Sequence, residues 1–95
     1  MCHMHIVYLI THDKTGEIYI GYTTNLKERI KAHNSGLNKS TARVKGKWIL
    51  VYAEAFLSKK DAQLRERRLK QHGRAVQELK KRIQHSLLQV SSGAG

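Results

Sequence analysis

The fold is decided by residues 5–22, which read HIVYLITHDKTGEIYIGY. Residues 5–11 are almost continuously apolar, as in a strand that is buried on both faces. Residues 13–16 supply turn chemistry, and Gly16 can adopt the positive φ that tight turns often require. Residues 17–22 then alternate between the two faces of a second strand. This stretch therefore predicts a β-hairpin whose first strand is central in its sheet.

A helix and a third strand are predicted directly after the hairpin. Asn25, followed three positions later by Glu28, has the pattern of a capping box, and the helix that it begins should end near Gly36. Residues 37–47 are small, polar and basic, which indicates an exposed loop. Apolar residues then recur densely over residues 48–56, and this pattern is typical of a strand.

Two more helices are predicted to complete the chain. Ser58 and Asp61 form a second capping pattern, and the helix that follows should end near His72. One further amphipathic helix is predicted from apolar residues at helical spacing, namely Val76, Leu79, Ile83 and Leu87. The predicted order is ββαβαα, in the α+β class.

Length and composition limit the organisation of the chain. Its 95 residues are enough for one hydrophobic core and too few for two, so we expect a single domain over residues 1–90 and a flexible tail over residues 91–95. Cys2 is the only cysteine, which excludes an intrachain disulfide. No apolar run reaches the length of a signal-peptide core or a membrane span, so the cytoplasm is the expected location.

Charge is the strongest signal in the composition. The chain carries 18 lysines and arginines against 7 acidic residues, a net charge of +11. Such a surface attracts polyanions, and no segment has the apolar face that a membrane-surface helix needs. Nucleic acid is therefore the expected partner: DNA, with RNA not excluded.

Basic residues concentrate in two regions, residues 39–47 and residues 59–82. The candidate nucleic-acid-binding residues are Lys39, Arg43, Lys45, Lys47, Arg65 and Lys70. No helix presents an obvious set of base-reading side chains, so low sequence specificity is expected. Any selectivity would come from DNA shape, from a homodimer or from a partner protein.

One carboxylate has an unusual predicted position. Glu66 follows Ala62 by four residues and precedes Leu69 by three, so it lies beside the helical stripe that should face the sheet. Judged from the residues alone, pairing with nearby arginines on a solvated face is the more common arrangement. Metal binding is the alternative for an inward carboxylate.

Four other side chains are candidates for phosphodiester chemistry. Arg29 and His33 are one helical turn apart, where an arginine can clamp a phosphate and a histidine can move a proton. Tyr8 and Tyr19 lie on the two arms of the hairpin, where cross-strand neighbours can share a patch. Each of these residues taken separately is more often structural.

The combination of these residues is more specific than any one of them. Residues 7–9 read VYL, residues 19–21 read YIG, and the candidate arginine, histidine and helical glutamate follow in order. This set resembles the GIY-YIG nuclease family over about residues 5–85. The resemblance is closest to small stand-alone bacterial members related to the nuclease module of the excision-repair incision subunit.

The resemblance implies a three-stranded antiparallel sheet flanked by helices and an endonuclease that hydrolyses DNA, with a link to DNA repair. Glu66 matches the family's metal ligand, for one Mg²⁺ or Mn²⁺ ion. Tyr8 or Tyr19 would orient or deprotonate the attacking water, Arg29 would bind the scissile phosphate and His33 would assist proton transfer. A single carboxylate ligand also agrees with the shortage of acidic residues.

A phenol is a weak base at neutral pH, because the pKa of an unperturbed tyrosine is about 10. Arg29, the metal and the positive field are expected to favour the phenolate, so activity should rise with pH.

The chain departs from the family pattern at Tyr22, where the repair subunit has lysine, and at Glu78, where many members have asparagine. These departures keep one alternative open, a catalytically weak or inactive nucleic-acid-binding module of the same fold. A small basic RNA-binding protein is a third possibility.

Overall fold

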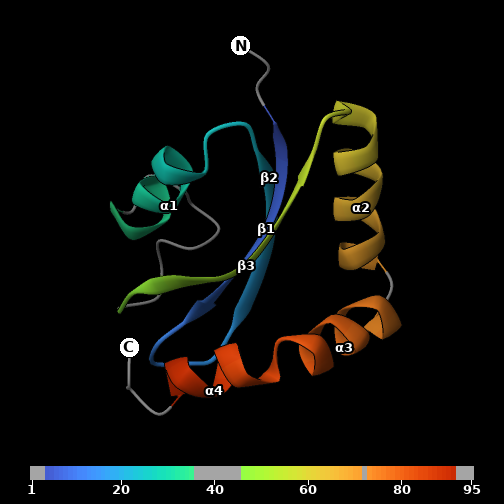
Figure 1. The fold of residues 1–95 in the computed structure, drawn as a ribbon. Coiled ribbons are helices and arrows are strands. Elements are labelled where there is room, and N and C mark those ends of the chain that lie inside the picture. Colours follow the sequence, from blue (N-terminus) through green and yellow to red (C-terminus); the bar gives the residue numbers. More distant parts are fainter. Residues whose placement is uncertain (1–3, 36–45, 72, 92–95) are drawn as a thin grey trace.

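A computed structural model describes residues 4–35, 46–71 and 73–91 of the chain, and Figure 1 shows its elements. The elements are β1 (His5–His12), β2 (Ile18–Thr23), α1 (Leu26–Ser35), β3 (Trp48–Phe56), α2 (Lys59–Gln71), α3 (Gly73–Arg82) and α4 (Gln84–Ser91). This order confirms the predicted α+β class and the ββαβαα arrangement, except that the last predicted helix is divided in two.

The three strands form one antiparallel sheet in the order β2-β1-β3, so β1 is central as predicted. Gly16 closes the hairpin with a φ of 75°. In the hairpin register Tyr8 pairs with Gly21, and Tyr19 pairs with Ile10. Side chains on a strand alternate between the two faces, and Tyr8 and Tyr19 fall on the same one.

Both predicted capping patterns are present. The Glu28 amide donates a hydrogen bond to Asn25 Oδ1 at 3.2 Å, and the Asp61 amide donates to Ser58 Oγ at 3.3 Å. These bonds satisfy amides that a helix end otherwise leaves without a partner. They fix where α1 and α2 begin, and therefore which side chains of each helix face the sheet.

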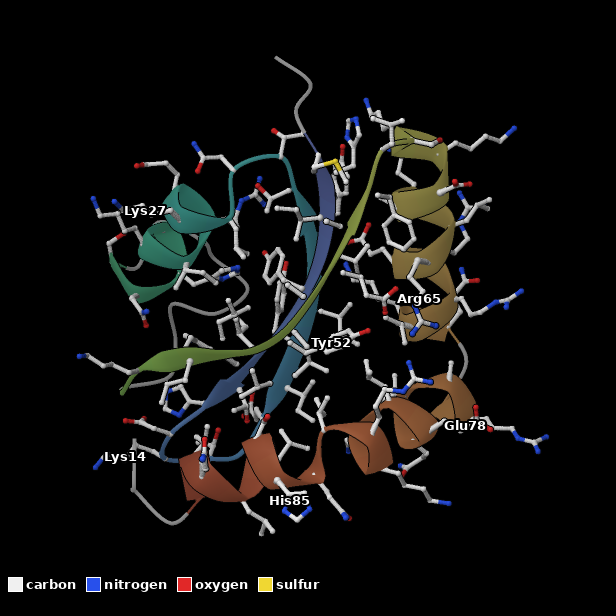
Figure 2. The ribbon with its side chains drawn as sticks, viewed as in Figure 1. Lys14, Lys27, Tyr52, Arg65, Glu78 and His85 are labelled. Atoms are coloured by element: carbon white, nitrogen blue, oxygen red, sulfur yellow. The ribbon has the colours of Figure 1, made fainter. Side chains whose placement is uncertain are left out.

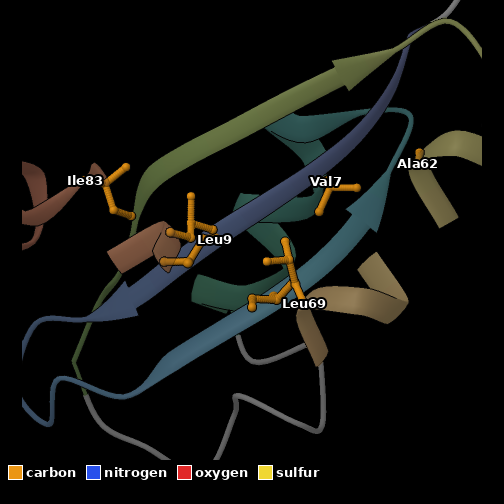
Figure 3. Packing of buried hydrophobic residues seen from close by; sticks show 7 residues of the cluster. Val7, Leu9, Ala62, Leu69 and Ile83 are labelled. Atoms are coloured by element: carbon orange, nitrogen blue, oxygen red, sulfur yellow. The ribbon is translucent and has the colours of Figure 1, made fainter. Parts of the chain in front are cut away.

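The two faces of the sheet are covered by different helices, with α1 on one side and α2 on the other (Figure 1). On the face toward α2, α3 and α4, a buried cluster comprises Val7, Leu9, Ile20, Ala62, Leu69, Leu79 and Ile83 (Figure 3). On the face toward α1, Tyr8, Ile10 and Trp48 are buried, with Tyr19, Leu26 and Ile30 packed against them. Because β1 alternates, Tyr8 belongs to the α1 face while its two neighbours belong to the α2 face.

The prediction of one helix over the last apolar stripe was wrong, because the chain turns at Ile83 between α3 and α4. The Ile83 amide still bonds the Leu79 carbonyl, and the Leu87 amide bonds the Ile83 carbonyl, both at 3.1 Å. The turn keeps Leu79 and Ile83 in the buried cluster of the α2 face, with Leu87 packed against it.

Several sequence predictions fall on residues 36–45 and 92–95, which lie outside the described residues. They concern most of the basic loop and the tail after Ser91, where α4 ends. Among the helices that the structure describes, none combines the length and the hydrophobicity needed to cross a membrane.

Candidate active site

The hairpin register brings the two predicted tyrosines together on the α1 face. The ring centroids of Tyr8 and Tyr19 are 6.5 Å apart. The space for Tyr8 exists because its strand partner is glycine: a Cβ at Gly21 would lie 2.5 Å from Tyr8 Cζ and closer still to the hydroxyl oxygen. Gly21 was absent from the predicted site residues, although the intact YIG motif was the signal that marked it.

The alternation of β1 also explains why the first motif tolerates its two changes. Val7 and Leu9 are each only 1% exposed and belong to the apolar cluster of the α2 face. Bulky apolar residues therefore improve packing on that face without entering the tyrosine patch. Tyr8 is the residue of this motif that faces the site.

His33 joins the two tyrosines from α1. Its Nε2 atom is 2.8 Å from the Tyr8 hydroxyl oxygen, and its ring packs edge-on against Tyr19 with centroids 4.9 Å apart. The histidine is 2% exposed. Arg29, one turn earlier on α1, is exposed, and its guanidinium is close enough to Tyr8 to lower the pKa of the phenol. The spacing of Arg29 and His33 thus places both side chains beside one phenol.

Burial controls the protonation of the buried phenol. Removal from water, followed by the nearby Tyr19, raises the pKa of Tyr8 to about 12, although Arg29 acts in the opposite direction. Arg29 thus favours the phenolate, as expected, but in the protein alone burial outweighs the guanidinium and the net shift is upward. At neutral pH Tyr8 keeps its proton.

The histidine beside this phenol is neutral. Burial, and then the charge of Arg29, lowers the pKa of His33 below 6.5, so its ring is neutral at pH 7. A neutral imidazole has one donor and one acceptor nitrogen, so the direction of the bond between the Tyr8 hydroxyl and His33 Nε2 is set by which ring nitrogen carries the hydrogen.

Glu66 reaches this patch from α2 through Lys70. Ala62 and Leu69 are buried against the sheet, and the Glu66 side chain between them keeps 22% of its surface exposed. Lys70 Nζ lies 3.1 Å from Glu66 Oε2 and 5.7 Å from the centroid of the Tyr19 ring. The negative charge of Glu66 also contributes to raising the pKa of Tyr8. All five predicted catalytic residues therefore belong to one connected group.

The donor set fits a divalent cation held by one protein ligand. In the part of the chain that the structure describes, no three His, Cys, Asp or Glu side chains gather around a common point. Magnesium is commonly bound through one or two carboxylates and keeps several waters, so Glu66 alone would be compatible with such an ion. Lys70 Nζ lies 3.1 Å from one of its two oxygens, Oε2, and would compete with a cation for it.

Two of the predicted nucleic-acid-binding side chains are already paired with carboxylates. Figure 2 shows Arg65 on α2 and Tyr52 on β3. Arg65 Nε and Nη2 each lie 2.9 Å from Glu54 Oε2. The Tyr52 hydroxyl also donates a hydrogen bond to Glu54 Oε2. The hydrogen bond to Glu54 raises the pKa of Arg65. Lys70 pairs with the candidate metal ligand.

The other predicted nucleic-acid-binding residues belong to the loop before β3. Lys47 is exposed, and its amide donates to Asp13 Oδ1 at 2.9 Å. Lys39, Arg43 and Lys45 lie outside the described residues.

The two departures from the family pattern lie away from the tyrosine patch. Tyr22 packs on the opposite face of the sheet, where its hydroxyl lies 2.7 Å from His5 Nδ1. Glu78 is exposed on α3 and lies 3.8 Å from Arg74 Nε.

Asn34 was not predicted, although it holds α1 against the sheet. Its amide side chain donates to the Trp48 carbonyl at 3.1 Å and accepts from the Trp48 amide at 2.8 Å. These two bonds tie the end of α1, and hence His33, to the start of β3. A polar residue at a helix end is common, so the sequence contains no signal for this role.

Residues 4–84 match the GIY-YIG catalytic domain family. This range contains the whole sheet and all five candidate catalytic residues. The match extends over most of the chain, so the protein belongs to this family, whose members are generally endonucleases.

Individual relatives agree with this assignment. A UPF0213 protein of Clostridium perfringens is 44% identical over 63 residues, which cover 66% of this chain and 67% of the relative. A UPF0213 protein of Staphylococcus haemolyticus is 40% identical over 70 residues, covering 74% of this chain and 84% of the relative. The solution NMR structure of a UPF0213 protein from Bacillus halodurans is 34% identical, with a TM-score of 0.53, over 84% of this chain and 86% of that one. These names state no activity.

Proposed function

We propose that this protein is a metal-dependent endonuclease that hydrolyses DNA phosphodiester bonds with low intrinsic sequence specificity. The observation that carries the proposal is the hydrogen bond between the buried Tyr8 hydroxyl and His33 Nε2, with Arg29 beside this phenol and the Glu66–Lys70 pair at the neighbouring Tyr19 ring. Packing alone does not require an arginine, a histidine and a phenol to gather in one place. The net charge of +11 supplies the attraction for a polyanionic substrate.

Arg29 and Glu66 have complementary roles in this proposal. The exposed guanidinium of Arg29 binds the scissile phosphate and stabilises the charge that develops on it. Glu66 would hold one Mg²⁺ or Mn²⁺ ion, which when bound neutralises phosphate charge and lowers the pKa of a coordinated water. Lys70, released from Glu66, is then available to a neighbouring phosphate.

Tyr8 and His33 act together as the base. A phenol whose pKa is about 12 is a poor base by itself, but its oxygen lies 2.8 Å from Nε2 of a neutral imidazole, and in this proposal Tyr8 donates that hydrogen bond. As the Tyr8 oxygen takes a proton from the attacking water, its own proton passes to His33 Nε2, so no phenolate accumulates. Tyr19 packs against both rings and keeps them in place.

Low sequence specificity follows from the composition of the site. Its groups recognise phosphates, and phosphate contacts carry no sequence information. A preference for particular DNA structures would arise from DNA shape, from a homodimer or from a partner protein.

The test is cleavage of labelled duplex, single-stranded and branched DNA, and of RNA, with Mg²⁺ and with a chelator. Native protein and the Glu66→Gln variant are compared. We expect Mg²⁺-dependent cutting of DNA that is lost in the variant.

The Lys70–Glu66 ion pair specifically favours the alternative of a binding module, because it covers the candidate metal ligand. Equal DNA binding by both proteins without cutting would establish that alternative. A clear preference for RNA would establish an RNA-binding protein.

A further inference from the structure

Three hollows adjoin one another around the outer side of α2. The first, about 340 Å³, contains Glu66, Lys70 and Arg67. The second, about 480 Å³, shares Arg67 with the first and Arg68 with the third. The third, about 590 Å³, lies between α2 and α3. Its charged residues are Arg65, Arg68, Arg74, Glu78 and Arg82.

Helical geometry places the first and the third hollow on opposite sides of α2. Successive residues on an α-helix are 100° apart, so Glu66 and Arg65 lie on either side of the buried line through Ala62 and Leu69. Arg67 lies on the exposed side of α2, opposite this buried line. The hollows therefore lead from the candidate metal ligand, across the exposed side of α2, to the groove between α2 and α3.

Three arginines along this route have no carboxylate partner among residues 4–35, 46–71 and 73–91, whereas the other basic residues of the hollows are paired. Lys70 pairs with Glu66, Arg65 pairs with Glu54, and Arg74 lies near Glu78. The unpaired residues are Arg67, Arg68 and Arg82. They follow one another along the hollows, with Arg67 nearest to the catalytic group and Arg82 furthest from it.

We propose that these hollows form a strand track, in which Arg67, Arg68 and Arg82 bind successive phosphates of the DNA strand beside the scissile bond. The inference rests on the proposed nuclease function and names where its substrate continues. An α-helix is about 10–12 Å across, and phosphates along one strand of a duplex rise about 3.4 Å each, so a strand that crosses α2 and continues toward α3 presents at least one phosphate to each of the three arginines.

The experiment compares two triple variants with equal loss of charge. Arg67→Gln/Arg68→Gln/Arg82→Gln removes the cations of the track. Lys59→Gln/Lys60→Gln/Lys81→Gln removes three exposed lysines that line none of the three hollows. Binding of a fluorescent duplex DNA is measured by anisotropy without divalent cations at several salt concentrations, and thermal melting checks that each variant is folded.

The arginine variant is expected to bind more weakly and to lose about 0.9 of the slope of log K against log salt for each lost phosphate contact, close to 3 in total. The lysine variant should change far less. Equal changes in the two variants, or no binding by the native protein, would overturn the strand track.

Cleavage assays separate this outcome from the proposed function. If the native protein cuts DNA and the two triple variants bind DNA equally well, the protein is a nuclease without this strand track. If the native protein never cuts DNA but its DNA binding depends on the three arginines, the strand track exists without the activity.

Discussion

Replacing Gly21 by alanine is expected to disrupt the contact between Tyr8 and His33. The new Cβ would lie 2.5 Å from Tyr8 Cζ and 2.9 Å from Cε1, whereas ordinary contacts begin at 3.4 Å. The Tyr8 ring must therefore move by about 0.9 Å. The hydrogen bond to His33 is 2.8 Å long, so a shift of this size along the bond takes it beyond hydrogen-bond distance.

Two measurements report on this displacement. A misplacement of about 1 Å in a catalytic group costs roughly 10²-fold in rate, so single-turnover nicking should slow by about that factor. Overpacking a buried site costs about 1–3 kcal/mol, which urea denaturation measures as a lower free energy of unfolding. The rate is compared at a temperature at which circular dichroism shows both proteins folded.

Gly73→Ala is the matched control. A Cβ at Gly73 meets no atom within 4 Å, and its φ is not positive, so the same chemical change occurs in open space. This variant should retain the native rate and lose no stability. A Gly21→Ala protein with native rate and native stability would refute the assignment of Gly21 as the residue that makes room for Tyr8.

Three further predictions concern proton transfer, metal binding and the attachment of α1. If Tyr8 and His33 act together, the rate should fall below pH 6.5, where His33, whose pKa is lowered, becomes protonated. The rate should stay flat from pH 7.5 to 9.5, because the pKa of Tyr8 is raised to about 12. A tenfold rise per pH unit in that range would show instead that phenolate is the base. Lys70→Gln should strengthen Mn²⁺ binding at Glu66 about two- to fivefold in calorimetry, because a partly exposed ion pair is worth up to ~1 kcal/mol; unchanged affinity would contradict competition. Asn34→Ala should lower the free energy of unfolding by about 1–3 kcal/mol through the loss of two hydrogen bonds, whereas a loss under 0.5 kcal/mol would show that they do not hold α1.

Most of the fold could be predicted from local sequence signals. Gly16 marked the hairpin turn, and Asn25 and Ser58 marked the starts of two helices, because turn and cap chemistry depends on residues close in sequence. The division of the last helix could not be predicted. The hydrogen bonds on both sides of Ile83 keep helical spacing, so the spacing of apolar residues does not reveal the break.

The membership of the candidate site was also predictable, whereas its protonation was not. Spacing alone left each of these residues more often structural, and only the resemblance to the GIY-YIG family indicated that Tyr8, His33 and Glu66 would form one site. The sign of the pKa shift at Tyr8 depends on how deeply the ring is buried between α1 and the sheet, which residue spacing does not reveal. The same holds for Lys70, whose sequence indicated phosphate binding and whose side chain lies on the Glu66 carboxylate.

The most direct test of the proposed nuclease is the single-turnover rate of plasmid nicking at saturating Mg²⁺ for the native protein, Glu66→Gln and Glu28→Gln. Glu28 is an exposed carboxylate in the first turn of α1, so its variant controls for the loss of one negative charge. We predict that Glu66→Gln is slower by at least about 10²-fold, equivalent to roughly 3 kcal/mol of transition-state stabilisation, and that Glu28→Gln is within about twofold of native. Nicking by Glu66→Gln at the native rate, or none by the native protein, would contradict the proposal.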